Sequence, residues 1–433
     1  MDVRDALGGR AERYEVMELR EEVTTVEYEA NRLKTCSVAE TSGSALRVVA
    51  GGREGFSAST KAGSEERLAA AALESAAYGD EAVFSFAAPA PGARVRCFDS
   101  KVADMGVERF AEIGRELVEL ALAEEPEARC DAGVYRSLVE TRIRGSGGLD
   151  SSWRSSPIFI WLNINRIEGD DILMLFDQLG TTVWEEDYSA FARRLVGKLA
   201  RSRRLDTIKP GRMPVLFAPA GALALAFPVM QALNGKEVLK GGSPLAGKIG
   251  QRLFDPKLSF VDDGTVDGRY GSAPYDAEGV PRRRNVLVDR GELRGFIYDL
   301  RTAAKAGAET TGSASRELFF RPPEPGFSNF SIEAGKTPLA DMIAGIDEGI
   351  LVEDLLGLGQ GNILSGAFSN PLSLAFKIEK GEIVGRVKGL AIAGNVYEVL
   401  KDVAAVSGET GRVYGSFEMP WVLLEDMSVA GKG

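Results

Sequence analysis

Alternating apolar and polar positions dominate the start of the chain and predict β-strands. The stretch TTVEYEANRLKTCSVAE alternates in this way, and ALRVVAGGREGFSAST continues the pattern on both sides of Gly51-Gly52. Glycine readily adopts the positive φ angles that a tight turn requires. We therefore expect strands over residues 14–60, with an antiparallel hairpin at this glycine pair.

Helical spacing of apolar residues predicts two helices next. Ser64 precedes EERLAAAALESAA, whose alanines and leucines favour helix, and we expect this serine to cap it. In GVERFAEIGRELVELALAEE, Phe110, Ile113, Leu117 and Leu120 recur every three or four residues. We expect both helices to cover one face of the sheet.

A strand with one fully apolar face and an amphipathic helix follow. SPIFIWLNINRIEG places isoleucine or leucine at every second position from 158 to 164. DYSAFARRLVGKLARSRR then puts Phe191, Leu195 and Leu199 on one side, with most of its basic residues on the other. This pattern predicts a second sheet-covering helix with a basic outer surface.

The second half of the chain is rich in glycine and in strand-turn-strand patterns. NVLVDRGELRGFIYD and LAFKIEKGEIVGRV share a tight-turn pattern of acidic, basic, Gly, Glu and apolar residues. Short helices are predicted near residues 302–308 and 338–348.

A polar stretch over residues 206–212 indicates a domain boundary. The predicted fold class is α+β, with an N-terminal sheet and covering helices in residues 1–208 and a sheet-rich C-terminal domain in residues 209–433.

Residues 213–235, MPVLFAPAGALALAFPVMQALNG, contain no charged side chain. The length of this run would suit a membrane span, but Pro214, Pro219 and Pro228 disfavour a lipid-facing helix. We predict a short buried strand in PVLFAP and a core helix in AGALALAFPVMQAL, entered after Pro219. Pro228 implies a kink or a late start of that helix.

Composition restricts the class of protein. The 433 residues are 44% apolar and 27% charged, typical of a soluble globular protein with two domains. A net charge of -11 argues against a dedicated nucleic-acid binder.

The charged N-terminus lacks the apolar stretch of a secretory signal, so we expect a cytoplasmic protein. Cys36, Cys97 and Cys130 are odd in number and widely spaced, which favours free thiols.

Histidine is absent from the sequence. Its absence excludes Ser-His-Asp and Cys-His nucleophile arrangements and every zinc site built on imidazole. Catalysis by this chain alone would depend on carboxylates, and their spacing in the sequence assigns no partners.

Three stretches resemble ligand sites, but each lacks a required feature. Basic residues between 193 and 212 could contact phosphates, yet no aromatic residues are interleaved for base stacking, and a solvated helix face is the favoured explanation. DDGTVDG at 262–268 begins like a calcium loop, but Pro274 stands where a bidentate glutamate is needed. GLGQGN at 357–362 does not lead from a strand into a helix, as a phosphate-binding loop would.

Several motifs together resemble a known family. RRRNVLVDRGELRGFIYDLRTAAKAGAETTGSASR, GLAIAGNVYEVLKDVAAVSG and WVLLEDMSVAG resemble the TldD/TldE family, also called PmbA or modulator of DNA gyrase. VEYEANRLKTCSVAETSGSALRVVAGGREGFSAST is similar to the family's opening hairpin, so the resemblance spans nearly the whole chain. In this family TldD-like members carry a His-Glu-x-x-x-His zinc motif and cleave small or unfolded peptides. TldE-like members lack the motif and are the partner subunit.

The family's zinc motif falls inside the uncharged run of this chain. The first histidine aligns with Ala226, the glutamate with Phe227 and the second histidine with Gln231. Alanine has no donor atom, phenylalanine cannot act as a base, and a lone amide is a poor zinc ligand. The family's C-terminal cysteine is also absent from residues 408–420, and Pro371–Ala375 replace small residues and glycine.

The resemblance therefore implies a TldE-like subunit with no catalytic residue, metal or cofactor of its own. Its expected partners are a peptide substrate and a TldD-like zinc-bearing homologue, in a heterodimer or larger assembly, with a homodimer also allowed. No membrane or nucleic-acid partner is expected. The alternative is a regulatory module of the gyrase-modulator type, supported by Arg193, Arg194 and Lys198. A third reading is an autonomous hydrolase that uses carboxylates alone.

Overall fold

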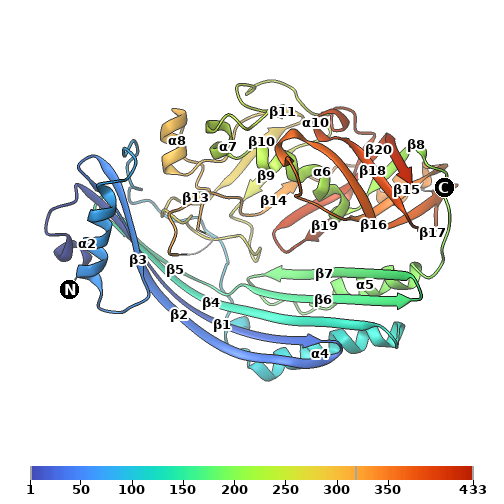
Figure 1. The fold of residues 1–433 in the computed structure, drawn as a ribbon, viewed down its shortest axis with the longest axis horizontal. Coiled ribbons are helices and arrows are strands. Elements are labelled where there is room, and N and C mark those ends of the chain that lie inside the picture. Colours follow the sequence, from blue (N-terminus) through green and yellow to red (C-terminus); the bar gives the residue numbers. More distant parts are fainter. Residues whose placement is uncertain (1, 317–318, 432–433) are drawn as a thin grey trace.

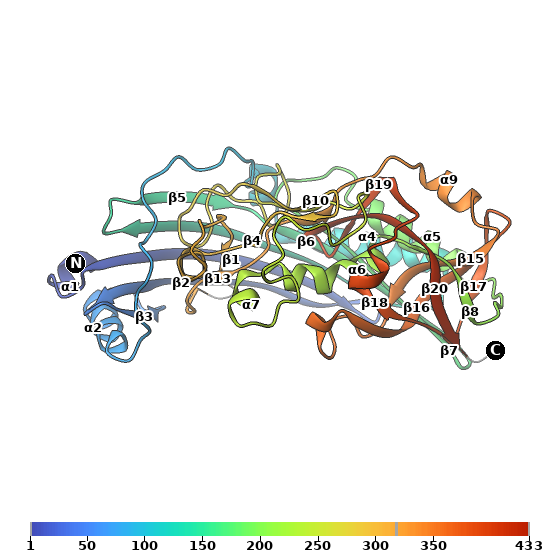
Figure 2. The same cartoon turned by 90° about the horizontal axis from the view of Figure 1, so that it is seen from above.

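The computed structural model describes residues 2–316 and 319–431 and contains one large sheet in each half of the chain (Figure 1). Helices and strands are mixed, which confirms the predicted α+β class. The two termini lie at opposite ends of the long axis in both views (Figures 1 and 2). The boundary between residues 208 and 209 stays a prediction, and it falls between the last helix of the first half and the first strand of the second sheet.

The N-terminal sheet is antiparallel and strongly curved (Figure 1). Its order is β3-β2-β1-β4-β6-β7, and β5 pairs with β4. The strands are β1 (Arg13–Glu29), β2 (Arg32–Ala50), β3 (Arg53–Ser59), β4 (Arg129–Gly145), β5 (Asp150–Ser155), β6 (Ile158–Glu168) and β7 (Asp171–Thr181). The predicted hairpin is confirmed, because Gly51 and Gly52 form its turn with φ angles of 58° and 73°.

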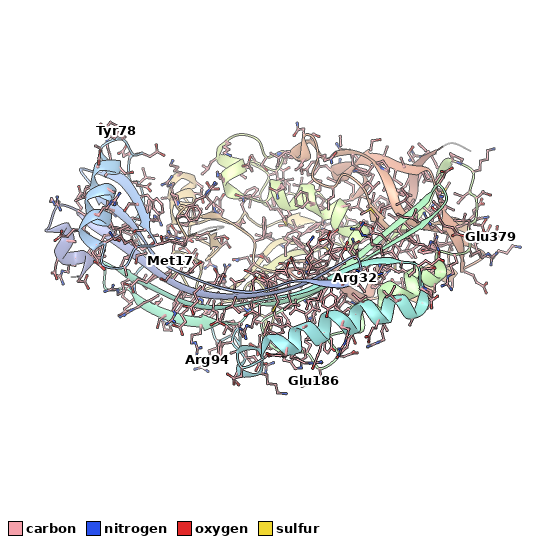
Figure 3. The ribbon with its side chains drawn as sticks, turned by 60° about the horizontal axis from the view of Figure 1, so that its bottom comes forward. Met17, Arg32, Tyr78, Arg94, Glu186 and Glu379 are labelled. Carbon is pink, nitrogen blue, oxygen red and sulfur yellow. The ribbon has the colours of Figure 1, made fainter. Side chains whose placement is uncertain are left out.

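Helices cover this sheet much as the apolar spacing predicted. They are α1 (Val3–Leu7), α2 (Glu65–Ala76), α3 (Ser100–Ala103), α4 (Val107–Glu124) and α5 (Ala190–Arg201). Val16 packs in the cluster of α2 and Val26 in that of α4. Val16 and Val26 are an even number of residues apart in β1, so their side chains point to the same face and the two helices cover that face. Figure 3 shows α4 running along the sheet.

The capping role expected of Ser64 is wrong, because its hydroxyl donates to the Lys61 carbonyl at 2.6 Å and accepts no helix N–H.

The C-terminal sheet closes on itself. Its order is β11-β10-β9-β14-β20-β18-β16-β15-β8, and β8 also pairs with β20, which gives a barrel-like ring. The ring and its extensions are β8 (Gly211–Phe217), β9 (Phe260–Asp263), β10 (Arg284–Asp289), β11 (Glu292–Leu293), β14 (Phe330–Ile332), β15 (Glu348–Leu355), β16 (Ala367–Glu379), β17 (Glu382–Val387), β18 (Leu390–Asn395), β19 (Ala405–Val413) and β20 (Phe417–Gly431). The remaining elements are α6 (Pro219–Ala232), α7 (Gly235–Leu239), α8 (Leu300–Ala306), β12 (Ala314–Ser315), β13 (Glu324–Pro325), α9 (Leu339–Ala344), the 3-10 helix η1 (Ile363–Ser365) and α10 (Val396–Val399).

Two hairpins of this half have the turn chemistry that the sequence predicts. Gly291 and Gly381 have φ angles of 77° and 78°, and the basic residues before them, Arg290 and Lys380, are also left-handed at 45° and 52°. Two successive positive φ angles match the right-handed twist of the strands that they connect. The turns join β10 to β11 and β16 to β17.

The uncharged run forms β8 and α6, as predicted. Pro219 is the first residue of α6 and Pro228 lies within the helix, so the alternative of a late start is wrong. Within the described ranges, no helix has both the length and the apolar character needed to cross a membrane. The cytoplasmic location stays a prediction.

A buried ionic cluster joins the two halves of the molecule. Arg47 of β2 lies 2.6 Å from Glu278, and Arg316 lies 2.7 Å from Glu15 of β1. Arg47 also stands 3.7 Å from Glu15, so the two pairs are linked. All four side chains are at most 4% exposed. Because each charge has lost its water, its partner in the other half of the chain is its main stabilisation.

A second clamp holds the β6–β7 hairpin to the C-terminal sheet. The Asp171 carboxylate accepts two hydrogen bonds from Arg386, each 2.9 Å long, and lies 2.7 Å from the Lys388 ammonium. Burial alone would raise the pKa of Asp171, but the bonds from Lys388 and Arg386 lower that pKa to about 2. The ionised form of Asp171 is therefore the one that the folded protein favours.

Arg47→Ala is expected to lower the free energy of unfolding by about 3–5 kcal/mol, because it leaves Glu278 buried without its cation. The control is Arg142→Ala on the same sheet, whose pair with Asp150 is about half exposed and whose loss should cost less than about 1 kcal/mol. Urea unfolding measures both. Equal losses in the two variants would contradict the role assigned to the cluster.

Asp171→Asn is expected to destabilise the protein by about 2 kcal/mol at neutral pH. This figure is the free energy that corresponds to lowering the pKa of Asp171 by about two units on folding. A lowered folded-state pKa gives stability that is present above the ordinary aspartate pKa and is lost as pH falls from about 4 to about 2. The difference between variant and wild type should therefore shrink over that range. Thermal melts at a series of pH values test this, and a difference independent of pH would refute it.

Candidate functional site

Helix α6 is the centre of the candidate site because it carries the positions singled out in the uncharged run. Pro219 begins the helix, where a missing N–H costs nothing. The helix lies among the C-terminal strands (Figure 1) and packs on β15 and β20. Ala226 is fully buried, whereas Phe227 and Gln231 are half-buried. The three positions therefore do not share one environment.

A groove of about 360 Å³ runs beside α6, and we call it the α6 groove. Its walls are α6, the end of β15, the loop after β15, the start of β16 and one residue of β18. Its lining residues are Phe217, Ala224, Leu225, Phe227, Pro228, Leu355, Leu356, Gly357, Leu358, Gly359, Gln360, Ile363, Ala367, Phe368, Ser369, Asn370, Pro371 and Ile392. None of them is charged, so the groove suits apolar side chains and neutral backbone groups.

The glycine-rich stretch at 357–362 forms one wall of this groove. Gly357, Gly359 and Gly361 all have positive φ angles, between 76° and 83°. A Cβ on Gly359 would lie 3.5 Å from the Phe227 ring. The stretch thus folds against Phe227 of α6, the position that the sequence analysis aligned with the motif's glutamate. The stretch follows strand β15, where the sequence predicted no strand, and leads into the three-residue 3-10 helix η1, so the expected connection is wrong. Its place at the groove was not foreseen.

Polar atoms hold the groove walls together. Asn370 donates from Nδ2 to the Leu356 carbonyl at 2.7 Å, and the Tyr397 hydroxyl donates to the Pro228 carbonyl at 3.3 Å. Burial raises the pKa of Tyr397 above its usual value, so this phenol is a neutral donor. Of the five residues Pro371–Ala375, Pro371 lines the groove while Leu374 and Ala375 are buried. Of these five residues, only Pro371 therefore lines the groove.

A second hollow of about 700 Å³, the interdomain cavity, lies between the two sheets. It is lined by α5 and β7 on one side and by β15, β19 and the start of α6 on the other. Asp177, Glu353 and Asp354 bring carboxylates to it, and Lys198 contacts Glu353 at 2.8 Å. The sequence analysis missed these acids, although each interrupts or ends an apolar strand pattern, which was the available signal.

Burial controls protonation in the interdomain cavity. It raises the pKa of Asp177 and that of Asp354 above the usual aspartate value, despite the cationic Lys198 near both. Burial and the charges of the two aspartates raise the pKa of Tyr414 to about 12. The cavity therefore presents carboxyl groups that hold protons more readily than exposed ones do.

The basic helix α5 proves to be ion-paired. Arg193 lies 2.5 Å from Asp187, Arg194 lies 3.9 Å from Asp177, and Lys198 reaches Glu353. These pairs occupy the cations that a phosphate contact would need. All three side chains line the interdomain cavity. Arg193 and Arg194 are more than half exposed, so the solvated helix face of the sequence analysis holds for them, whereas Lys198 is only 26% exposed.

The remaining candidate ligands have structural roles. Asp262 accepts bonds from the backbone and hydroxyl of Ser328, and Asp263 accepts from Thr265 within a turn. In residues 2–316 and 319–431, no group of three or more Cys, Asp or Glu side chains is arranged to hold a metal ion. Cys97 and Cys130 are buried and Cys36 is exposed, all as free thiols.

Comparisons with known proteins agree with this geometry. The family model for the PmbA/TldA metallopeptidase C-terminal domain matches residues 210–431, just over half of the chain, and that for PmbA/TldA metallopeptidase domain 1 matches residues 14–77. A metalloprotease TldD homolog of Haemophilus influenzae is 36% identical over 221 residues, 51% of this chain and 46% of that protein. A metalloprotease PmbA homolog of the same organism is 25% identical over 340 residues, 76% of this chain and 71% of that protein. The chain spans about half the length of the curated relatives that it matches first.

Solved structures share the fold over the whole chain. TldE from Thermococcus kodakarensis superposes with a TM-score of 0.90 at 25% identity and covers 99% of both chains. A putative modulator of a DNA gyrase from Thermotoga maritima superposes with a TM-score of 0.87 at 21% identity, again over 99% of both chains. The family match and the fold agree with the resemblance in the sequence. The chain therefore belongs to the TldD/TldE/PmbA family of metallopeptidase-related proteins.

Proposed function

We propose that this chain is the metal-free, TldE-like subunit of a two-component peptidase that acts on small or unfolded peptides. One observation supports the proposal: α6 and its groove are present, but the positions that the resemblance aligns with the zinc motif hold Ala226, Phe227 and Gln231. A TldD-like homologue supplies the metal site. This chain supplies subunit contacts and part of the peptide-binding surface.

The residues at these positions do not fit a zinc ion. Zinc sites in proteins use imidazole nitrogen, thiolate sulfur or carboxylate oxygen, usually from three or four side chains. Ala226 and Phe227 offer no donor atom, and Gln231 offers a single neutral amide. We therefore assign no metal-dependent step to this chain.

The α6 groove suits a peptide better than a small charged ligand. Its lining has apolar side chains and the uncharged amides of Gln360 and Asn370. Extended peptides combine apolar side chains with neutral backbone groups, which such a wall can accommodate. This match supports a peptide-binding role for the groove.

The two alternatives gain less support. A gyrase-type regulator would need free basic side chains on α5, yet Arg193, Arg194 and Lys198 all lie within 4.0 Å of a carboxylate. A hydrolase using carboxylates alone would find acids in the interdomain cavity, such as Asp177 and Asp354. Burial raises the pKa of both aspartates, which disfavours the ionised form that a carboxylate nucleophile needs.

The purified chain alone is expected to bind no zinc and to cleave no peptide, since it lacks the ligands. Mixing it with a zinc-bearing TldD-like homologue should give peptide cleavage that a chelator abolishes. Metal analysis and a peptide-cleavage assay, each with and without the homologue, measure this. Chelator-sensitive cleavage by this chain alone would sink the proposal.

Ser369→Trp is expected to weaken peptide cleavage by the two-chain complex at least about tenfold, because an indole ring would fill part of the α6 groove. Ser152→Trp is the matched control, since Ser152 is an exposed strand serine of the other sheet, far from the groove lining. Both variants should melt near the wild-type temperature. Equal activity of the two complexes would show that the groove does not hold substrate.

A further inference from the structure

A third hollow of the molecule lies between α7 and α8. Its volume is about 820 Å³, and its walls are these two helices, β12 and the segment around β13. Figure 1 shows α7 and α8 next to each other, and the two helices are in contact. The hollow shares no lining residue with the α6 groove or the interdomain cavity. We call it the α8 pocket.

Positive side chains from three separate segments converge on the α8 pocket. Two come from α7 and the residue that follows it, two from α8 and one from the segment before β13. The five cations are Lys236, Lys240, Arg301, Lys305 and Arg321. Since the whole chain has a net charge of -11, this concentration of cations is a local exception. A concave surface lined by one sign of charge focuses its electric field, so the pocket attracts anions.

The two carboxylates of the lining do little to cancel these cations. Asp299 is 2% exposed, and its carboxylate is occupied by the backbone N–H and the hydroxyl of Thr302, each at 2.7 Å. Glu324 lies 2.5 Å from Lys236, but its side chain is 62% exposed. An ion pair as exposed as this one contributes at most about 1 kcal/mol. A ligand with several negative charges can therefore displace Glu324 from Lys236.

Three more carboxylates contact the cations from outside the lining. The contacts are Glu54 with Arg301, Asp80 with Arg301 and Lys305 at 4.0 and 3.9 Å, and Glu237 with Lys240 at 3.0 Å. None of these three carboxylates lines the pocket, so the surface that a ligand meets is positive. The interdomain cavity differs, because Asp177 and Glu353 line it together with the cations that they contact.

The uncharged part of the lining is rigid. Pro322, Pro323 and Pro325 form much of one wall, and a proline ring fixes the backbone φ angle. Leu239, which is 40% exposed, adds an apolar surface. A wall that is rigid before binding reduces the entropy that binding costs. The volume lies within the range of small-molecule sites in proteins, so a ligand as large as a nucleotide fits.

We propose that the α8 pocket binds a small polyanion whose charge lies on a chain of phosphate groups. Arg301 and Arg321 carry planar guanidinium groups that suit paired contacts with phosphate oxygens, and the lysines add point charges. Five cations against two carboxylates leave three positive charges in excess, which matches several phosphates held close together. The inference is independent of the peptidase proposal, because the pocket lies outside the α6 groove.

Isothermal titration calorimetry on the purified full chain tests the ligand chemistry. Tripolyphosphate or ATP should bind with a Kd below about 100 µM in low-salt buffer without divalent cations, and citrate at least about tenfold more weakly. Tighter binding of ATP would identify a nucleotide as the source of the phosphates, and weaker or equal binding would identify free polyphosphate. The proposal fails if neither phosphate compound binds below about 1 mM, or if citrate binds as tightly as the better of the two.

Loss of one lining cation tests the location. Lys305→Gln should weaken binding of the better probe about fivefold, because it removes one attractive charge from the pocket. Lys401→Gln is the matched control, since its lysine lies outside the lining and is 54% exposed, against 42% for Lys305. Both variants should melt near the wild-type temperature. Equal weakening in the two variants, or none in Lys305→Gln, would overturn the proposal.

Loss of a lining carboxylate should have the opposite effect. Glu324→Gln should strengthen binding of the same probe about threefold, because it frees Lys236 from an exposed competing carboxylate. Such a gain cannot come from damage to the fold. Glu398→Gln is the control, because it removes a similarly exposed carboxylate, paired with Lys401, from outside the pocket. Unchanged or weaker binding in Glu324→Gln, or an equal gain in the control, would contradict the assignment.

Discussion

A helix and a strand segment that are buried on nearly every side can carry no charge, and α6 and the inner half of β8, Val215–Phe217, obey this constraint. Val215 and Phe217 of β8 face the core around α6, whereas Leu216 faces the core that α4 and α5 share with the C-terminal strands. A charged side chain on either face of β8 would lose its water without gaining a partner. The closed ring of strands and the α6 groove are both built on this uncharged core.

The same constraint decides the chemistry of the groove. Its inner wall is α6, and no residue that lines it is charged. Ionisable groups are excluded from this wall and gather in the interdomain cavity, where Lys198 and Glu353 balance one another. The protein thus keeps an apolar binding surface and a polar cavity apart, although α6 borders both.

Buried ion pairs orient the two sheets relative to each other. The clusters around Arg47 and Asp171 cost much desolvation, so they add little net stability. If one sheet were displaced relative to the other, these charges would be buried without partners. The ion pairs therefore favour the observed placement of the two sheets. An apolar core that includes Phe110 of α4 and Phe376 of β16 supplies the attraction. The interdomain cavity exists because these contacts hold its two walls at a set distance.

The sequence by itself determined the local elements and the limits of the chemistry. Alternation, helical spacing and turn glycines predicted the strands around Gly51, the helices with Phe110 and Phe191, and the strand and helix of the uncharged run, because these signals act between neighbouring residues. It also excluded histidine chemistry outright. Ser64 was misjudged because a serine hydroxyl has several local partners.

Only the tertiary structure decided how distant parts meet. The pairing of Arg47 with Glu278, 231 positions away, and the approach of the 357–362 loop to Phe227 depend on ring closure and sheet docking. No local pattern reports such contacts, because they come from packing of whole elements. The groove and the interdomain carboxylates belong to this second group, since each is a relation between surfaces that the chain brings together only when folded.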